Sequence, residues 1–282
     1  MKVLVTGVKG QLGFDVCNEL TKRGIENKGI DRNDCDITDE KAVYSYIKNY
    51  APDVVIHCAA YTAVDKAEDE KEICYNVNVN GTKYIARASK EINAKMVYIS
   101  TDYVFEGTGD KAYEVQDKIS PNNTYGLTKY QGEEEVKNIL DKYFIIRISW
   151  VFGINGNNFI NTMVKLGETR SELNVVADQI GSPTYTYDLA PLICDMIETE
   201  KYGIYHATNE GYCSWADFAE YIFSITGQRV KVHHINSEEY PTKASRPKNS
   251  RLSKASLDKV GFKRLPEWKD AVKRYIKEKF NK

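Results

Sequence analysis

The sequence predicts an α/β protein in which a doubly wound parallel sheet is followed by a smaller C-terminal lobe. Three observations support this fold class. Short apolar segments alternate with helical segments from the N-terminus to Trp150, a glycine-rich turn directly follows the first apolar segment, and the alternation becomes less regular after Trp150. Such alternation favours parallel strands joined by right-handed helical crossovers.

The expected strands are short and apolar throughout, which is typical of strands covered by helices on both faces. They span residues 2–6, 28–31, 54–58, 96–100 and 143–149. Helical segments separate them at residues 14–23, 39–50, 71–92 and 125–140, and three asparagines interrupt the third of these helices. Thr38 is in position to cap the helix that starts at residue 39.

The remaining chain predicts three further helices, near residues 159–169, near residues 187–198 and after Ser214. Ser214 and Asp217 resemble a capping box in which aspartate replaces the usual glutamate. We expect residues 1–152 to form the sheet domain and residues 153–282 to form most of the smaller, substrate-binding lobe. Part of residues 180–205 is expected to return to the sheet.

Composition argues against several classes of partner. The 282 residues carry a formal net charge of -1, which favours neither a nucleic acid nor a membrane surface. No stretch reaches the ~18 apolar residues of a membrane span, and the first apolar run meets Gly7 too early for a signal peptide. The six cysteines form no C-x-x-C pair, so we expect no metal site and a reducing, cytoplasmic location.

Three glycines, Gly7, Gly10 and Gly13, stand where the first strand turns into the first helix. One glycine permits the tight turn, the next lets backbone approach a pyrophosphate, and the third allows close packing of helix on strand. The helix N-terminus adds free N–H groups and a partial positive charge. This position predicts that residues 1–152 form a Rossmann-like, dinucleotide-binding domain.

The choice of dinucleotide stays open between NADH and NADPH. Asp31 ends the second expected strand, where an acidic side chain can bind the 2′-hydroxyl of the adenosine ribose in NADH. Arg32 follows at once and can instead accept the 2′-phosphate of NADPH. Asp36 and Ile37 are expected to flank the adenine.

Tyr125 and Lys129 are spaced so that they share one face of a helix. An ammonium near a phenol favours the phenolate and is expected to lower the tyrosine pKa, which suits a general acid in carbonyl reduction. Ser100, Thr101 and Asp102 follow the fourth expected strand, at the edge of the sheet where ligands bind. A hydroxyl of Ser100 or Thr101 can then stabilise the developing oxyanion.

These motifs resemble the extended short-chain dehydrogenase/reductase family and, within it, the dTDP-4-dehydrorhamnose reductases. The glycine turn marks the superfamily. The segments that are more specific to the reductase group are Ala63–Glu68, Ser100–Phe105 and Ser245–Pro247. Other matching segments run nearly from end to end, among them residues 52–56, 78–82, 147–153, 156–159 and 178–184.

The resemblance implies NAD(P)H-dependent reduction of the C4 keto group of dTDP-4-dehydro-6-deoxy-L-mannose to dTDP-L-rhamnose. Thr101 would polarise the carbonyl, Tyr125 would protonate the oxygen, and Lys129 would tune Tyr125 and hold the nicotinamide ribose. Besides these three residues and the cofactor contacts above, the resemblance implies cofactor contacts from Gln11, Leu12, Ala59, Ala60, Tyr61 and Asn80. It implies substrate contacts from Val64, Asp102, Tyr103, Trp150, Asn158, Gln179, Arg246 and Arg251.

Tyr103 helps to separate this activity from sister chemistries, because the related 4,6-dehydratases carry an acidic residue at that place. Two alternatives remain: a reductase of another 4-keto-6-deoxy sugar nucleotide, and a catalytically silent regulatory subunit resembling that of methionine adenosyltransferase. A monomer or a homodimer is expected. The magnesium-bridged dimer of some relatives uses a glutamate on the first helix, where this chain has Asp15.

Overall fold

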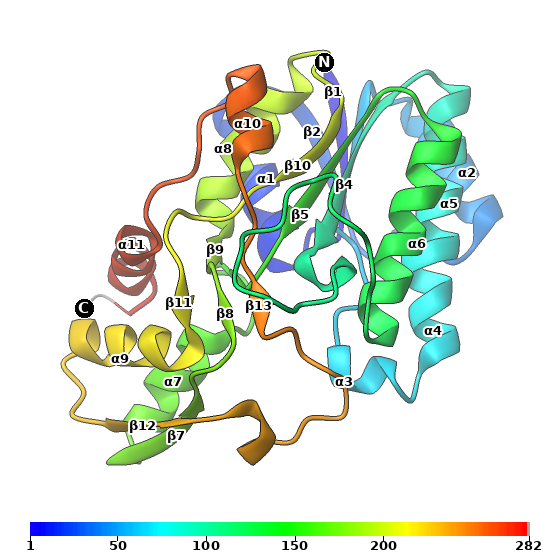
Figure 1. Cartoon of the computed structure of the whole chain (residues 1–282). Coiled ribbons are helices and arrows are strands. Elements are labelled where there is room, and N and C mark those ends of the chain that lie inside the picture. Colours follow the sequence, from blue (N-terminus) through cyan, green and yellow to red (C-terminus); the bar gives the residue numbers. More distant parts are fainter. Residues whose placement is uncertain (281–282) are drawn as a thin grey trace.

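The computed structural model describes residues 1–280 and is built on a parallel sheet of six strands. The strands lie in the order β2-β1-β3-β4-β5-β10, and every neighbouring pair is parallel (Figure 1). Their bounds are β1 (Lys2–Thr6), β2 (Glu26–Ile30), β3 (Val54–His57), β4 (Lys95–Thr101), β5 (Tyr143–Ile148) and β10 (Gly203–His206). The predicted doubly wound parallel sheet is confirmed.

The strand order creates a switch point in the middle of the sheet. From β1 the chain crosses to β2 on one side, and it later continues through β3, β4 and β5 on the other side. In open α/β sheets, ligands bind in the crevice at the carboxyl ends of the strands that flank such a point. The ends of β1 and β3 therefore mark where a ligand site belongs.

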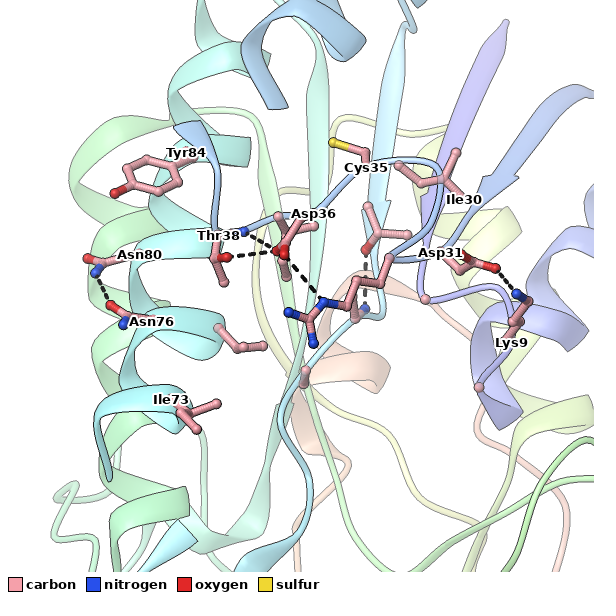
Figure 2. A pocket seen from close by; sticks show the side chains of 18 residues that line it. Lys9, Ile30, Asp31, Cys35, Asp36, Thr38, Ile73, Asn76, Asn80 and Tyr84 are labelled. Atoms are coloured by element: carbon pink, nitrogen blue, oxygen red, sulfur yellow. Dashed lines mark hydrogen bonds and ion pairs between the residues drawn. The ribbon is translucent and has the colours of Figure 1, made fainter. Parts of the chain in front are cut away.

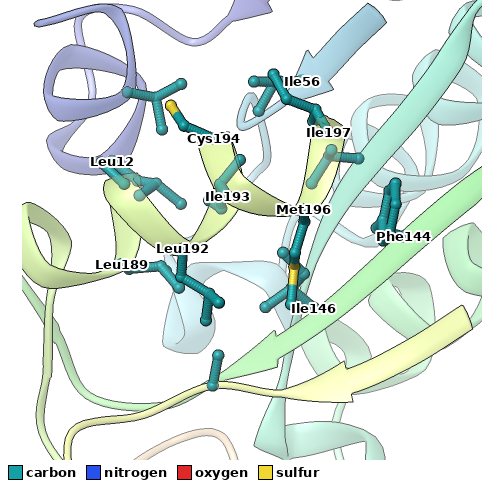
Figure 3. Close-up of a cluster of buried hydrophobic side chains, with 14 of the residues drawn as sticks. Leu12, Ile56, Phe144, Ile146, Leu189, Leu192, Ile193, Cys194, Met196 and Ile197 are labelled. Carbon is teal, nitrogen blue, oxygen red and sulfur yellow. The ribbon is translucent and has the colours of Figure 1, made fainter. Parts of the chain in front are cut away.

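Helices cover both faces of the sheet. One face carries α1 (Gln11–Lys22), α8 (Thr186–Ile197) and α10 (Ala255–Val260), and the other carries α2 (Glu40–Tyr50), α5 (Thr82–Glu91) and α6 (Thr124–Ile139) (Figure 1). Side chains alternate between the two layers as a pleated strand requires: Val3 and Val5 join the first core and Leu4 joins the second. Figure 3 shows the first core, with α8 packed against Phe144 and Ile146 of β5.

The helical segment expected at residues 71–92 is continuous but changes its winding in the middle. It consists of α4 (Lys71–Tyr75), a π-helical stretch at Asn76–Gly81 and α5. The wider winding turns Asn78 inward, where its amide donates to the Tyr61 carbonyl oxygen (3.2 Å) and its Oδ1 accepts from the Tyr61 N–H (2.8 Å). Such π-bulges are frequent at functional sites.

Two capping predictions have different outcomes. Ser214 and Asp217 form the expected capping box at the start of α9 (Trp215–Thr226). The assignment of Thr38 as the cap of α2 is wrong, because Asp39 accepts the N–H groups of Lys41 and Ala42. The Thr38 hydroxyl instead donates to Asp36 Oδ1 (2.7 Å).

The C-terminal lobe has its own core of stacked aromatic rings. It packs α7 (Phe159–Gly167), α9 and α11 (Trp268–Phe280) around Phe152, Tyr185 and Tyr275. Paired short strands complete it: β6 (Val151–Phe152) with β9 (Thr184–Tyr185), β7 (Glu172–Val176) with β12 (Lys231–Ile235), and β8 (Ile180–Gly181) with β11 (Cys213–Ser214) and β13 (Asn249–Ser250).

The C-terminal half also contributes to the sheet layer at two places. Residues 186–206 supply α8 and the edge strand β10, and residues 255–265 supply Leu257, Phe262 and Leu265 to the core beneath them. The short elements α3 (Val64–Ala67), η2 (Asp102–Val104) and η3 (Ser237–Glu239) lie in the connections. The two halves are therefore interleaved around the sheet, and the domain boundary placed after residue 152 stays a prediction.

Candidate active site

The glycine turn lies at the switch point and brings two strand ends into contact. Gly7 follows β1 with φ 73°, and a Cβ at this position would lie 2.7 Å from the Ala59 backbone nitrogen beyond β3. A Cβ on Gly13 would lie 2.4 Å from the Gly7 carbonyl oxygen, so α1 packs closely on the turn. Larger residues fit neither position, as the spacing predicts.

The N-terminus of α1 is left open for a ligand. Gly10 is its N-cap and supplies no side-chain hydrogen bond, and the first helical hydrogen bond runs from the Phe14 N–H to the Gly10 carbonyl oxygen. The N–H groups of Gln11 and Leu12 therefore precede the first helical bond. Together with the partial positive charge of the helix end, they fit a pyrophosphate.

A cavity of about 620 Å³ extends from this turn between β2 and the π-helical stretch (Figure 2). Eight of the expected cofactor contacts line it: Gly7, Gly10, Asp31, Asp36, Ile37, Ala59, Ala60 and Asn80. The sequence prediction missed one wall, formed by Ile73, Asn76, Val77 and Tyr84. With Asn80 these residues recur at helical spacing, and that periodicity was the available signal.

The two acidic side chains at one end of this cavity, Asp31 and Asp36, already form ion pairs within the chain. Asp31 forms an ion pair with Lys9 of the glycine turn (Figure 2) and accepts the Asn33 N–H at 2.7 Å. The hydrogen bond from Lys9 is the main reason that the pKa of Asp31 lies below its usual value. Arg32 is 87% exposed in its side chain and reaches Asp36 at 3.3 Å. Both groups proposed for the adenosine ribose therefore lie at the mouth of the cavity.

A second cavity of about 610 Å³ adjoins the first and holds the expected catalytic residues. The two cavities share Gly7, Lys9, Gly10, Ala59 and Ala60. Of the predicted site residues, those that line the second cavity include Gln11, Leu12, Val64, Thr101, Asp102, Tyr103, Tyr125, Lys129 and Trp150. A dinucleotide lying across the turn would thus reach from the first cavity into the second.

The side chains predicted to be catalytic come from the ends of β4 and α6. Thr101 is the last residue of β4, and its hydroxyl donates to Asp102 Oδ1 (3.0 Å) and accepts the Tyr103 N–H (3.2 Å). Tyr125 lies in the first turn of α6, which Asn123 caps by accepting the Gly126 N–H. The Ser100 hydroxyl donates to Glu133 (2.5 Å), whereas the Thr101 hydroxyl is close enough to Tyr125 to lower its pKa, so Thr101 is the better placed of the two for a substrate carbonyl.

Burial controls the ionisation of the catalytic pair. It raises the pKa of Tyr125 well above its ordinary value of 10.0, while the Thr101 hydroxyl lowers it in part. Burial lowers the pKa of Lys129 from 10.5 to about 7, against the attraction of Glu133. The Lys129 ammonium lies 4.1 Å from the centre of the Tyr98 ring. The expected lowering of the Tyr125 pKa is therefore wrong for the chain alone, because desolvation of the phenolate is the largest effect and the nearby Asp102 raises the pKa further.

Five predicted site residues lie outside the lining of both cavities: Tyr61, Asn158, Gln179, Arg246 and Arg251. Asn158 caps α7, and its amide nitrogen donates to Gln11, Gly153 and Tyr275. Gln179 accepts a hydrogen bond from Trp215. These two contacts give both residues a structural function, and their contact with substrate stays a prediction.

The two predicted arginines lie on the segment that follows η3. Arg246 pairs with Asp65 (2.6 Å) and donates to the Tyr103 hydroxyl (3.3 Å), while Tyr103 meets Tyr125 edge to face at 5.6 Å between ring centres. Arg251 donates to Asn249 Oδ1 (2.9 Å). Arg246 is thus connected to Tyr125 through one aromatic ring.

No group of three or more potential metal ligands occurs within residues 1–280. Asp15, which stands at the position of the bridging glutamate, is buried and accepts a hydrogen bond from the Thr186 hydroxyl. Its pKa is raised to about 6, mainly by burial. Among the described residues, no helix is long and apolar enough to cross a membrane.

A dinucleotide cleft at the switch point of the sheet, continued by a cavity with Thr101, Tyr125 and Lys129, defines the short-chain dehydrogenase type of oxidoreductase. The chain belongs to the family described as "RmlD substrate binding domain", whose model matches residues 1–280. It is 41% identical to the spore coat polysaccharide biosynthesis protein SpsK of Bacillus subtilis, over 99% of this chain and 98% of that protein.

Two further relatives carry a more specific name. A dTDP-4-dehydrorhamnose reductase of Aggregatibacter actinomycetemcomitans is 40% identical over 96% of this chain and 97% of its own length. The crystal structure of dTDP-4-dehydrorhamnose reductase from Bacillus anthracis in complex with NADP superposes with a TM-score of 0.96 at 44% identity. The superposition covers 99% of this chain and 100% of the Bacillus anthracis chain.

Proposed function

We propose that this protein is an NAD(P)H-dependent reductase that converts dTDP-4-dehydro-6-deoxy-L-mannose to dTDP-L-rhamnose. The observation that carries the proposal is the continuous pair of cavities, one fitted to a dinucleotide and the other lined by Thr101, Tyr125 and Lys129. The relatives named dTDP-4-dehydrorhamnose reductase support the choice of substrate, because they match nearly the whole chain.

The ionisation of the cavity suits proton donation to a carbonyl oxygen. Since burial keeps the Tyr125 phenol protonated at neutral pH, the side chain holds the proton that the new alkoxide needs. The Thr101 hydroxyl lies on the strand end beside it and can hydrogen-bond the same oxygen. A bound reduced nicotinamide supplies the hydride.

Lys129 is proposed to hold the nicotinamide ribose and to assist Tyr125. Burial lowers its pKa to about 7 in the chain alone, so a nearby negative charge on a bound cofactor would shift it towards the ammonium form. Lys129 is a positioning and tuning residue in this proposal. Tyr125 remains the proton donor.

Recognition of the sugar nucleotide is proposed to come from the C-terminal lobe and α3. Trp150, Tyr103 and Val64 line the catalytic cavity and offer apolar surface to the sugar. Arg246 and Arg251 bring guanidinium groups suited to a diphosphate. We propose either reduced dinucleotide as cofactor, a cytoplasmic location, and a monomer or homodimer.

The test is turnover of the keto sugar made by coupling the upstream dehydratase and epimerase reactions. Loss of reduced nicotinamide absorbance is followed with NADH and with NADPH, and the product sugar is identified after hydrolysis. Rhamnose formation supports the proposal and ranks the two cofactors. A different 6-deoxy sugar, or cofactor binding without turnover, would contradict it.

A further inference from the structure

Trp150 stands in a strained conformation at the carboxyl end of β5. Its φ is 48°, which places a bulky residue in the left-handed region. Three hydrogen bonds tie the chain around it to Ser182 and to the first residue of β9: Thr184 N–H to the Trp150 carbonyl oxygen (3.1 Å), Thr184 hydroxyl to the Ser149 carbonyl oxygen (2.6 Å) and Ser149 hydroxyl to the Ser182 carbonyl oxygen (2.8 Å). Strain persists where the surroundings over-determine a residue in this way, commonly at ligand sites.

The indole of Trp150 is held from behind by a second tryptophan. Trp215, the first residue of α9, stacks on it with ring centres 3.7 Å apart and an interplanar angle of 16°. Trp215 is absent from the lining of both cavities, whereas Trp150 lines the catalytic one. Phe159 packs against Trp215 at 4.7 Å, so the stack is backed by the aromatic core of the lobe.

Two more residues restrict this stack. Trp215 Nε1 donates to Gln179 Oε1 (3.2 Å), which fixes the rotation of its ring. On the Trp150 side, β8 passes so close that a Cβ on Gly181 would lie 2.9 Å from Trp150 Cε2. The position of Trp150 is therefore set by its backbone, by Gly181 and by the Trp215 face, and Gln179 acts one step further away.

We propose that Trp215, supported by Gln179, is a positioning residue for the sugar-nucleotide site: it holds the Trp150 indole as a preformed wall of the catalytic cavity. A wall that is already ordered costs no further side-chain entropy when the ligand binds. The proposal rests on the proposed function, because the ligand is taken to be a nucleotide sugar. In this proposal Gln179 acts indirectly, by fixing the orientation of the Trp215 ring.

The test measures binding of dTDP-L-rhamnose and of NADPH by calorimetry to the full chain. Trp215→Ala should lower the affinity for dTDP-L-rhamnose about tenfold, which is the size expected for the loss of one aromatic pair. The affinity for NADPH should stay unchanged. Trp215→Phe, which keeps a stacking ring, should retain most of the affinity, and Gln179→Leu should lose part of it. Trp268→Phe is the matched control, because Trp268 packs on Phe218 and Tyr221 and is one ring further from Trp150 than Trp215, with Phe218 between them.

Circular dichroism supplies an independent reading of the stack itself. Two indoles at this separation couple, so the wild type and Trp268→Phe should show an exciton couplet that Trp215→Ala and Trp215→Phe both lose. Loss of the couplet in Trp215→Ala with unchanged affinity for dTDP-L-rhamnose would overturn the proposal. If the wild type showed no turnover but Trp215→Ala still bound dTDP-L-rhamnose more weakly, the proposed reaction would be contradicted. The positioning role of Trp215 would still be supported.

Discussion

Single ionisable residues in the catalytic cavity are governed by burial more than by their charged neighbours. Tyr125 is kept protonated and Lys129 is brought towards neutrality by the same removal of water. The spacing of the two residues along a helix showed that they share a face. It could not show how deeply that face is buried, and this is why the direction of the Tyr125 pKa was missed.

Asp102 provides a pH test of that burial. Its pKa is raised from 3.8 to about 6, mainly by burial, so between about pH 4 and pH 6 the folded chain binds more protons than the unfolded chain. The free energy of unfolding should therefore carry a contribution that falls as the pH rises through this window. Asp102→Asn removes the group, and its stability should decline less from pH 4 to pH 6.

Urea unfolding of the wild type and Asp102→Asn at several pH values between about 4 and 7 makes the comparison. Other buried carboxyls, Asp15 among them, contribute equally to both proteins and cancel. Parallel declines of the two unfolding free energies would show that Asp102 titrates normally in the folded chain.

Among the elements, α6 is fixed to the sheet by a buried ion pair below the catalytic turn. Arg147 of β5 donates to both oxygens of Glu133 at 2.9 and 2.7 Å, and Ser100 of β4 donates to the same carboxylate. Glu133 lies one turn beyond Lys129 on α6. Glu133 therefore joins the helix that carries Tyr125 to β5 through Arg147, and to β4, the strand that ends in Thr101, through Ser100.

Glu133→Ala should destabilise the fold by roughly 3–5 kcal/mol, because it leaves the Arg147 guanidinium buried without its partner. Glu134→Ala on the same helix is the matched control: its pair with Lys137 is about one-third exposed and should be worth less than ~1 kcal/mol. Thermal and urea unfolding measure both. Equal, small effects would mean that water reaches Arg147 and that the pair does not anchor α6.

The elements themselves were largely predictable from sequence. Five of the six strands in the parallel sheet were recognised from sequence, and α9 by its Ser214–Asp217 box, whereas β10 and the short strands of the C-terminal lobe were not. The π-helical stretch at Asn76–Gly81 was not, because three spaced asparagines indicate an interruption without saying how the backbone absorbs it. Asp39 displaced Thr38 as the cap of α2 by a shift of one residue, which lies within the uncertainty of helix ends.

On the scale of the whole molecule, a segment of the C-terminal half is fastened across to α3 and α6. Arg246 pairs with Asp65 (2.6 Å), the Ala244 N–H donates to the other Asp65 oxygen (3.1 Å), and Asn123 donates to the Ser245 carbonyl oxygen (2.8 Å). These residues are about 120 or more positions apart in the chain. No local sequence pattern reveals such contacts. The sequence therefore predicted Arg246 as a site residue but could not predict that it pairs with Asp65.

Asp65→Ala should loosen this segment and leave the dinucleotide cleft intact. Hydrogen exchange at residues 243–246 should rise about fivefold, the size expected for a partly exposed ion pair, with unchanged affinity for NADPH. Lys248→Ala is the matched control, since Lys248 pairs with Asp178 inside the lobe. Unchanged exchange in Asp65→Ala would show that the other contacts hold the segment without Asp65.

The most direct test of the whole account is the kinetics of Tyr125→Phe with the keto sugar nucleotide and NADPH. Removing the proton donor should lower kcat by about 10²–10⁴-fold, while the Kd for NADPH, measured by fluorescence, stays at the wild-type value. Tyr130→Phe, on the same helix but outside both cavities, should turn over normally. Near wild-type turnover by Tyr125→Phe would contradict the assignment of Tyr125 as the proton donor.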